Sequence, residues 1–498
     1  MDLLWFKRDL RIQDHAPLVA AAEQSSLLCL YVFEPSTWES VEYAPCHHEF
    51  INECLQELQE ALERRGSGLH IAYGEVPVVL ADIRRRYPFT RLLSHEETGL
   101  LRTYERDLRV RKFCQQSGVS WLEFPQTGVV RRLRGRDGWS GQWLSRMKKP
   151  VAPTPDRLPP PPFSLAFQLR SVEELGLAGR SMPERQLGGS RLAHETLTSF
   201  LDHRGKSYRQ GMSSPVTAIT SCSRLSPYLA YGAITMKQVH QRLETVRKDA
   251  KGNPDRRGWA GSLSSYAGRL RWHCHFMQKL EDEPELEWKN LHPGYDGLRE
   301  AFDERLFEAF CRGETGYPMV DACLHYLAKT GWINFRMRAM LMSFCSYHLW
   351  LHWRRPAEFL ARQFLDFEPG IHYSQCQMQS GTTGINAIRI YSPAKQVLDQ
   401  DPEGAFIRAQ LPALARVPKA YLAEPHTMPL AVQKEARCEI GSAYPAPIVD
   451  HATAYKEARR QMFAWRQRPE VKEHNDAVYQ KHGSRRRPPK RERSQDDD

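Results

Sequence analysis

The chain has 498 residues and a formal net charge of +11, and aromatic residues make up 10% of it. This length suits two or three domains with substantial hydrophobic cores, and the aromatic content excludes a disordered or fibrous protein. A basic balance favours an acidic partner, of which nucleic acid is the commonest.

The 11 cysteines are scattered and include no C-x-x-C pair. This pattern argues against a disulfide framework, an iron–sulfur cluster and structural zinc, so we expect a reducing compartment and no metal site. Charged residues interrupt the first apolar run at Lys7, Arg8 and Asp9, and no stretch is long enough to span a membrane. We therefore expect a cytoplasmic monomer without a signal peptide or a membrane anchor.

Residues 1–128 alternate short apolar runs with amphipathic segments, which predicts alternating strands and helices. The runs are apolar throughout, as in strands that are buried on both faces. Such alternation with short links predicts a doubly wound parallel sheet, whose ligands bind beyond the carboxyl ends of the strands. Strands are expected at residues 2–6, 26–33, 68–74, 90–94 and 119–124, and helices at 50–66 and around 99–116.

The composition changes after residue 128. Residues 129–190 begin as a basic segment and continue as a proline-rich stretch, so we interpret them as an inter-domain linker. Residues 191–483 show helical periodicity throughout and predict a larger all-α domain. Residues 484–498 are basic and then acidic, and we expect a disordered tail that is either simply solvated or attracts nucleic acid.

Four segments of the helical region combine polar, charged and aromatic residues: 221–234, 268–288, 313–344 and 366–396. Hydroxyls in the first segment precede an expected helix, where free N–H groups bind phosphate, although an ordinary N-cap explains them equally well. His273 and His275 point apart on a helix, which argues against shared zinc ligation. The fourth segment is polar within a region expected to be buried, which favours a polar ligand such as a flavin ring.

The same segments contain SRLSPYLAYG, GETGYP-x-VDA, TGW-x-N-x-R-x-R and G-x-N-x-IRIY-x-P, and the chain opens with LLWFKRDLRIQDHAPL. In this order they resemble the cryptochrome/photolyase family, from residue 2 to about residue 483. The resemblance implies an N-terminal α/β domain that often binds an antenna chromophore, folate or deazaflavin, and a helical domain that holds FAD.

The resemblance also implies which residues bind FAD. Arg338 and Asp366 would form a salt bridge over the isoalloxazine, with Glu368 nearby. His372 would face flavin N5, where photolyases usually have Asn. The residues implied at the phosphates and the ribityl chain are Tyr208, Ser223, Arg224, Leu225 and Ser226.

Repair members of the family flip a pyrimidine dimer out of DNA and split it with an electron from excited reduced FAD. Trp272 matches the Trp that stacks on the flipped dimer, although core packing is the alternative. Trp353 matches the middle member of the family's tryptophan wire for photoreduction, while Trp350, Tyr373 and Tyr391 offer another route. The linker residues expected to contact DNA phosphates are Arg131, Arg132, Arg134, Lys148 and Lys149.

Several positions depart from the family pattern. Arg269 replaces a Glu that contacts the dimer, Met378 a second pocket Trp, and Phe335 an Asn near the flavin. Cys376 stands at the inner position of the wire. We predict a light-driven photolyase for pyrimidine dimers with damaged DNA as its partner. The alternatives are a cryptochrome photoreceptor without repair, which the altered pocket favours, and a light-independent nucleic-acid-binding flavoprotein.

Overall fold

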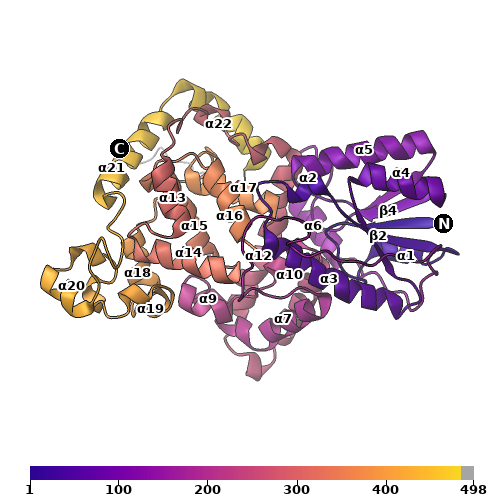
Figure 1. Ribbon diagram of the computed structural model, residues 1–498, viewed down its shortest axis with the longest axis horizontal. Helices are drawn as coiled ribbons and strands as arrows, with labels where there is room; N and C mark the ends of the chain where they lie inside the picture. The colour runs from indigo at the N-terminus through magenta and orange to yellow at the C-terminus, as the bar shows by residue number, and fades with distance from the viewer. Residues whose placement is uncertain (484–498) are drawn as a thin grey trace, which may run out of the picture.

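The computed structural model describes residues 1–483 and has an α/β lobe beside a larger helical lobe (Figure 1). A five-stranded parallel sheet with the order β3-β2-β1-β4-β5 forms the first lobe. The first strand is central and the chain winds to one edge and then to the other, which confirms the predicted doubly wound sheet. The strands, each within one residue of its predicted bounds, are β1 (Asp2–Phe6), β2 (Leu27–Phe33), β3 (Leu69–Tyr73), β4 (Arg91–His95) and β5 (Ser120–Phe124).

Helices cover both faces of this sheet. Leu4 and Phe6 of β1 pack into the hydrophobic cluster that contains Phe50, whereas Leu3 and Trp5 pack into the opposite cluster. Because successive side chains point to opposite faces, both-face burial explains why these strands are apolar throughout. The helices of this lobe are α1 (Ala16–Ala21), α2 (Pro35–Trp38), α3 (Pro45–Glu63), α4 (Val76–Arg86) and α5 (Leu101–Ser117).

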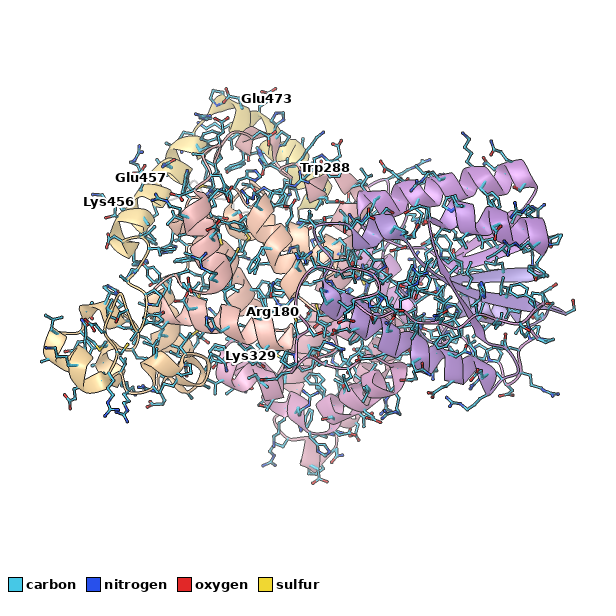
Figure 2. The ribbon with its side chains drawn as sticks, viewed as in Figure 1. Arg180, Trp288, Lys329, Lys456, Glu457 and Glu473 are labelled. Atoms are coloured by element: carbon cyan, nitrogen blue, oxygen red, sulfur yellow. The ribbon has the colours of Figure 1, made fainter. Side chains whose placement is uncertain are left out.

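The segment expected to be a linker contains a helix, α6 (Trp139–Lys148). Trp139 and Trp143 are buried in the hydrophobic cluster that also contains Phe6 of the sheet and Leu263 of the helical lobe, so one core runs through both lobes. The segment after α6 first runs along the α/β lobe, where the Ile71 N–H donates to the Ala166 carbonyl, and then reaches the helical lobe, where the Glu184 N–H donates to the Lys329 carbonyl. Arg180 and Lys329 lie in the same region of Figure 2.

Residues 190–482 are mainly helical, as predicted, and Gly331, at φ +66°, ends one of the central helices. In residues 1–483 no helix combines the length and the apolar character needed to cross a membrane. The predicted tail, 484–498, lies outside the described residues. The helices are α7 (Ser190–Asp202), α8 (Tyr208–Gly211), α9 (Pro215–Ser221), α10 (Ser226–Ala230), α11 (Met236–Asp249), α12 (Ala260–Asp282), α13 (Glu304–Arg312), α14 (Pro318–Thr330), α15 (Phe335–Ser343), α16 (Arg354–Gln363), α17 (Pro369–Ser380), α18 (Pro393–Gln400), α19 (Ala405–Gln410), α20 (Leu430–Ala436), α21 (His451–Arg466) and α22 (Pro469–His482).

Candidate functional site

A two-pronged ion pair joins α15 to the loop before α17. Both terminal nitrogens of Arg338 lie 2.9 Å from the carboxylate oxygens of Asp366, and Arg338 Nε donates to the Ile333 carbonyl at 2.8 Å. The Asp366 side chain is only 4% exposed. Burial by itself would raise the pKa of Asp366, but the charge and the hydrogen bonds of Arg338 outweigh it and hold that pKa below its ordinary value. The sequence-predicted pair is therefore present, and it is ionised.

A second ion pair connects the two lobes. Arg8, just after β1, lies 3.3 Å from Glu368 Oε2 through Nη2 and donates from Nε to the Ala230 carbonyl at 2.7 Å. Burial raises the pKa of Glu368 to about 7, although the Arg8 charge opposes this. The other carboxylate oxygen, Oε1, is buried without a hydrogen-bond partner in residues 1–483, so a ligand can use it.

His372 lies on α17, and its ring contacts the rings of Phe364 and Phe367, which are close to Asp366 in the sequence. Its Nε2 is 2.8 Å from the Ala357 carbonyl. Burial lowers the pKa of His372 to about 4, so the ring is neutral at physiological pH. Nε2 therefore carries the proton that this carbonyl accepts, and Nδ1 is left as an acceptor.

Two arginines without carboxylate partners lie near the predicted phosphate-binding segment. The Arg224 guanidinium stacks 4.0 Å from the centre of the Trp332 ring and donates to Gln186 at 3.0 Å. Arg204 donates to the Ser223 carbonyl at 3.2 Å. Burial lowers the pKa of both arginines, and among the described residues neither forms an ion pair. Such half-buried cations favour an anionic ligand.

The other residues predicted to bind the phosphates differ in how deeply their side chains are buried. Tyr208 is buried against Phe200, and burial raises its pKa to about 12. Leu225 is completely buried, so only its backbone can face a ligand. Ser223 and Ser226 are half-buried on either side of it, at the start of α10.

Trp272 lies on the surface. It is 52% exposed, and Phe335 of α15 is 45% exposed. The Arg269 guanidinium lies 4.5 Å from the centre of the Trp272 ring and 6.0 Å from that of Phe335. This exposure excludes the core alternative for Trp272. The exposed rings of Trp272 and Phe335, with the half-buried Arg269 beside them, form a surface that we call the aromatic–arginine patch.

Trp353 is completely buried, and its indole N–H donates to Asn290 at 2.8 Å. Tyr373 packs edge-on against it, with 6.2 Å between ring centres. Cys376, at the inner position of the family's wire, is also buried. Within residues 1–483, the rings in contact with Trp353 are those of His352 and Tyr373, and none is a second tryptophan.

The five basic residues predicted to contact DNA fall into two groups. Arg132, Arg134, Lys148 and Lys149 are exposed, and none of them forms an ion pair within residues 1–483. Arg131 is only 20% exposed and lies 3.3 Å from Glu123 and 3.8 Å from Glu281. Arg131 is therefore neutralised by its own neighbours, whereas the other four can meet phosphates.

Two family models match the chain in sequence order. The DNA photolyase model matches residues 2–134, and the model of the FAD binding domain of DNA photolyase matches residues 266–464. The chain belongs to the cryptochrome/photolyase family. As a member of this family it carries an FAD-binding domain that contains Arg338, Asp366, Glu368 and His372.

Relatives within the family include both repair enzymes and a cryptochrome. The chain is 25% identical to a deoxyribodipyrimidine photo-lyase of Alkalihalophilus pseudofirmus, over 91% of this chain and 96% of the relative. It is 26% identical to a (6-4)DNA photolyase of Oryza sativa (92% and 89%) and to a cryptochrome DASH of Gloeobacter violaceus (90% and 93%). Its fold matches a class III photolyase from Agrobacterium tumefaciens with a TM-score of 0.82 at 24% identity, over 94% of this chain and 98% of that one.

The residues present fit the FAD of cryptochromes and photolyases. The Arg224 cation, which has no carboxylate partner among the described residues, suits its diphosphate, and the free Oε1 of Glu368 suits a polar ring. The Arg338–Asp366 pair would lie against the isoalloxazine and tune its affinity for electrons. Bound FAD supplies light-driven one-electron chemistry, and the protein's part is to bind and orient it.

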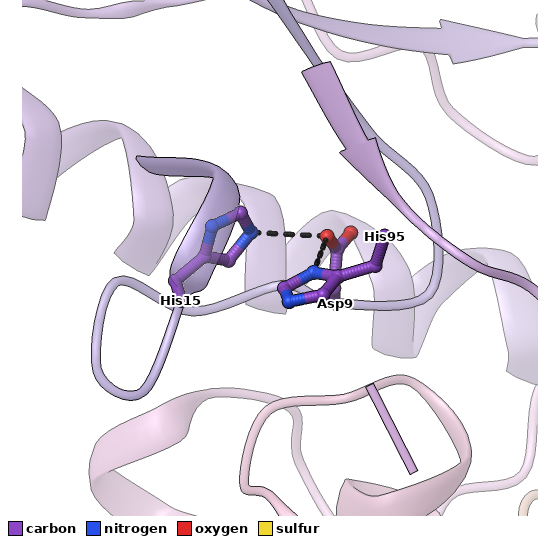
Figure 3. Close-up of side chains that lie close together, drawn as sticks. All are labelled: Asp9, His15 and His95. Carbon is purple, nitrogen blue, oxygen red and sulfur yellow. Dashed lines mark hydrogen bonds and ion pairs between the residues drawn. The ribbon is translucent and has the colours of Figure 1, made fainter. Parts of the chain in front are cut away.

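Asp9, His15 and His95 form a buried cluster outside this site (Figure 3). Asp9 Oδ2 lies 3.0 Å from His15 Nε2 and 2.6 Å from His95 Nδ1, while the Leu18 N–H donates to His15 Nδ1. Because Nδ1 accepts a hydrogen bond, the proton of a neutral His15 ring is on Nε2, which therefore donates to Asp9. Burial lowers the pKa of both histidines, to about 3 for His95. The cluster is a hydrogen-bond network that holds the loop after β1.

Two cavities lie at the carboxyl ends of the strands, where an antenna chromophore would bind. A cavity of about 60 Å³ lies there, and Arg106 occupies its edge with ion pairs to Glu34 at 2.9 Å and Glu97 at 2.5 Å. A larger cavity of about 290 Å³ lies beside it. Trp38, Tyr73 and Arg170 are among the residues that line this larger cavity.

Proposed function

We propose that this protein is a light-driven DNA photolyase that splits cyclobutane pyrimidine dimers with an electron from reduced FAD. The observation that carries the proposal is the exposed aromatic–arginine patch on α12 and α15. An exposed Trp ring suits stacking on a base that has left the duplex, and guanidinium N–H groups suit the carbonyl oxygens or phosphates of a lesion.

Each part of the site has a task in this proposal. Trp272 stacks on the flipped dimer and Arg269 donates hydrogen bonds to it. The Arg338–Asp366 pair orients the cofactor, and the neutral His372 ring contributes no positive charge beside it. FAD held by these residues would supply the electron for opening the cyclobutane ring.

The proposal is tested with two lesions. Reduced holoprotein is mixed with oligonucleotides that carry either a thymine dimer or a (6-4) photoproduct, and both samples are exposed to blue light. We expect restored thymines from the dimer and no restoration from the (6-4) photoproduct. Restored thymines from the (6-4) photoproduct alone would contradict the proposal and indicate a (6-4) photolyase.

Affinity for damaged DNA should fall steeply with salt, because the four exposed cations in and on either side of α6 would displace counterions from phosphates. Changing Arg132, Arg134, Lys148 and Lys149 together to Ala should reduce the slope of log K against log salt by about 3 to 4. Arg131→Ala is the matched control and should change the slope little, because Arg131 is already paired. Filter binding at several salt concentrations measures both, and equal slopes in all three proteins would remove these residues from the DNA interface.

A cryptochrome photoreceptor is the second candidate. The donor-only Arg269, together with Phe335 and Met378 at positions where repair relatives use other residues, favours it. In that case light would reduce the flavin, but damaged and undamaged DNA would bind equally and no thymines would be restored.

We also propose that the 290 Å³ cavity holds the antenna chromophore, a folate or a deazaflavin. Its aromatic lining and the Arg170 guanidinium, 3.9 Å from the centre of the Tyr73 ring, suit a planar anionic ligand. Trp38→Ala should reduce the binding of a reduced folate by about 5- to 160-fold, since stacking on one ring contributes roughly 1–3 kcal/mol. Fluorescence titration measures this, and unchanged binding would exclude the cavity.

A further inference from the structure

Tyr373 is a buried tyrosine whose hydroxyl has a carboxylate acceptor. It is 1% exposed, and its hydroxyl donates to Glu42 Oε1 at 3.0 Å. Glu42 is itself buried, and its other oxygen lies 3.0 Å from Arg102 Nη2. The hydrogen bond therefore joins α17 of the helical lobe to the loop between α2 and α3 of the other lobe.

The ring of Tyr373 also lies within a chain of aromatic rings. On one side, its centre is 5.2 Å from that of His372 and 6.3 Å from that of Phe367, the residue between Asp366 and Glu368. On the other side, Trp353 is 6.2 Å away and stacks on His352, which is half-buried. Tyr373 thus lies between the flavin-binding residues and a tryptophan that leads towards the surface.

The residue at the inner position of the family's wire cannot fill that role here. Cys376 is a buried thiol, and burial raises its pKa well above the ordinary value, so it stays protonated and has no aromatic ring. A tyrosine gives up an electron readily only when its hydroxyl proton can leave at the same time. Burial, together with the charge of Glu42, raises the pKa of Tyr373, so this proton needs a positioned acceptor.

We propose that Tyr373 is the electron donor for photoreduction of FAD and that Glu42 accepts the hydroxyl proton that Tyr373 loses at the same time. One electron leaves the Tyr373 ring for the oxidised flavin that blue light has excited, and the hydroxyl proton moves to Glu42. The O–H bond of Tyr373 breaks and an O–H bond forms on Glu42 Oε1, so that a neutral tyrosyl radical remains and the flavin is reduced by one electron. This inference goes beyond DNA repair and holds for a repair enzyme and for a photoreceptor alike.

A second tyrosine in the helical lobe provides a matched control. The Tyr444 hydroxyl donates to the buried carboxylate of Asp321 at 2.6 Å, which repeats the tyrosine–carboxylate chemistry. None of the ring contacts found among residues 1–483 links Tyr444 to Trp353, Tyr373 or His372. Tyr444→Phe therefore removes an equivalent hydrogen bond outside the ring chain.

The experiment uses the full-length holoprotein with oxidised FAD and an external thiol as the final reductant. A blue-light flash is followed by transient absorption and by electron paramagnetic resonance, which distinguish tyrosyl from tryptophanyl radicals. Four variants are compared: Tyr373→Phe, Glu42→Gln, Arg102→Met and Tyr444→Phe. FAD occupancy and melting temperature are measured in each, so that a folding defect is recognised independently of photochemistry.

We expect a tyrosyl radical in the wild type and in Tyr444→Phe, and none in Tyr373→Phe. Glu42→Gln should slow radical formation by about 100-fold or more, because a positioned proton acceptor contributes roughly 10²–10⁴-fold. Arg102→Met removes the ion pair but keeps the carboxylate, so the tyrosyl radical should persist. A wild-type protein that forms only tryptophanyl radicals, or a Tyr373→Phe variant with full FAD occupancy and unchanged photoreduction, would overturn the proposal.

Discussion

Replacing Arg338 by Met should abolish most FAD binding. The change leaves the Asp366 carboxylate, 4% exposed, without the cation that holds it ionised. Removing one partner of a buried ion pair typically destabilises a protein by about 3–5 kcal/mol, because an uncompensated charge remains. The same change removes the group that would lie against the isoalloxazine. FAD released by denaturation and quantified by chromatography should fall below about one tenth of the wild-type amount.

A double variant separates cofactor binding from folding. In Arg338→Met/Asp366→Leu no buried charge remains, and apolar replacement of a buried pair is often neutral or stabilising. We therefore expect its melting temperature to return to that of the wild-type apoprotein while FAD remains absent. If either variant retains full FAD occupancy, this pair does not belong to the cofactor site.

Trp272→Ala should weaken binding to DNA that contains a pyrimidine dimer by about 1–3 kcal/mol, which is the contribution of stacking on one base. Binding to undamaged duplex should stay nearly unchanged, because it depends on phosphates alone. Since Trp272 is 52% exposed, we expect stability to change by no more than about 0.5 kcal/mol. Titration with matched damaged and undamaged oligonucleotides, together with thermal unfolding, measures both effects.

Phe463→Ala is the control for this prediction, because Phe463 is 68% exposed on α21, away from the aromatic–arginine patch. It should alter neither affinity. Equal weakening on damaged and undamaged DNA after Trp272→Ala would remove the main residue-level support for repair. A loss of melting temperature and of FAD in parallel would show that Trp272 has a structural role.

The sheet could be predicted because its strands are buried on both faces. Leu3 and Leu4 of β1 pack into opposite clusters, so the run has no polar alternation, and its ends are marked by charged and turn residues. Helix α6 was not predicted, because the basic and proline-rich composition of residues 129–190 is typical of a linker. Trp139 and Trp143 of that helix are buried only because both lobes pack around them, and no local pattern contains that information.

The site, too, has residues that the sequence predicted and contacts that it did not. The resemblance of the motifs to a known family identified Arg338 and Asp366, which are 28 residues apart, and the structure brings them together. Arg8 pairs with a residue from the other lobe, and Glu42 accepts a hydrogen bond from Tyr373 across 331 positions. Such contacts depend on how two lobes meet. Periodicity reports local structure, so it gave no indication of either contact.

Restoration of thymines by light tests the central claim most directly. Holoprotein with fully reduced FAD is bound in the absence of oxygen to an oligonucleotide with one thymine dimer, and intact thymines are counted after blue light, in the dark, and with oxidised FAD. We predict restoration only in the illuminated, reduced sample, approaching one dimer per protein in a single turnover. A bound, illuminated and fully reduced complex that leaves every dimer intact would contradict the account.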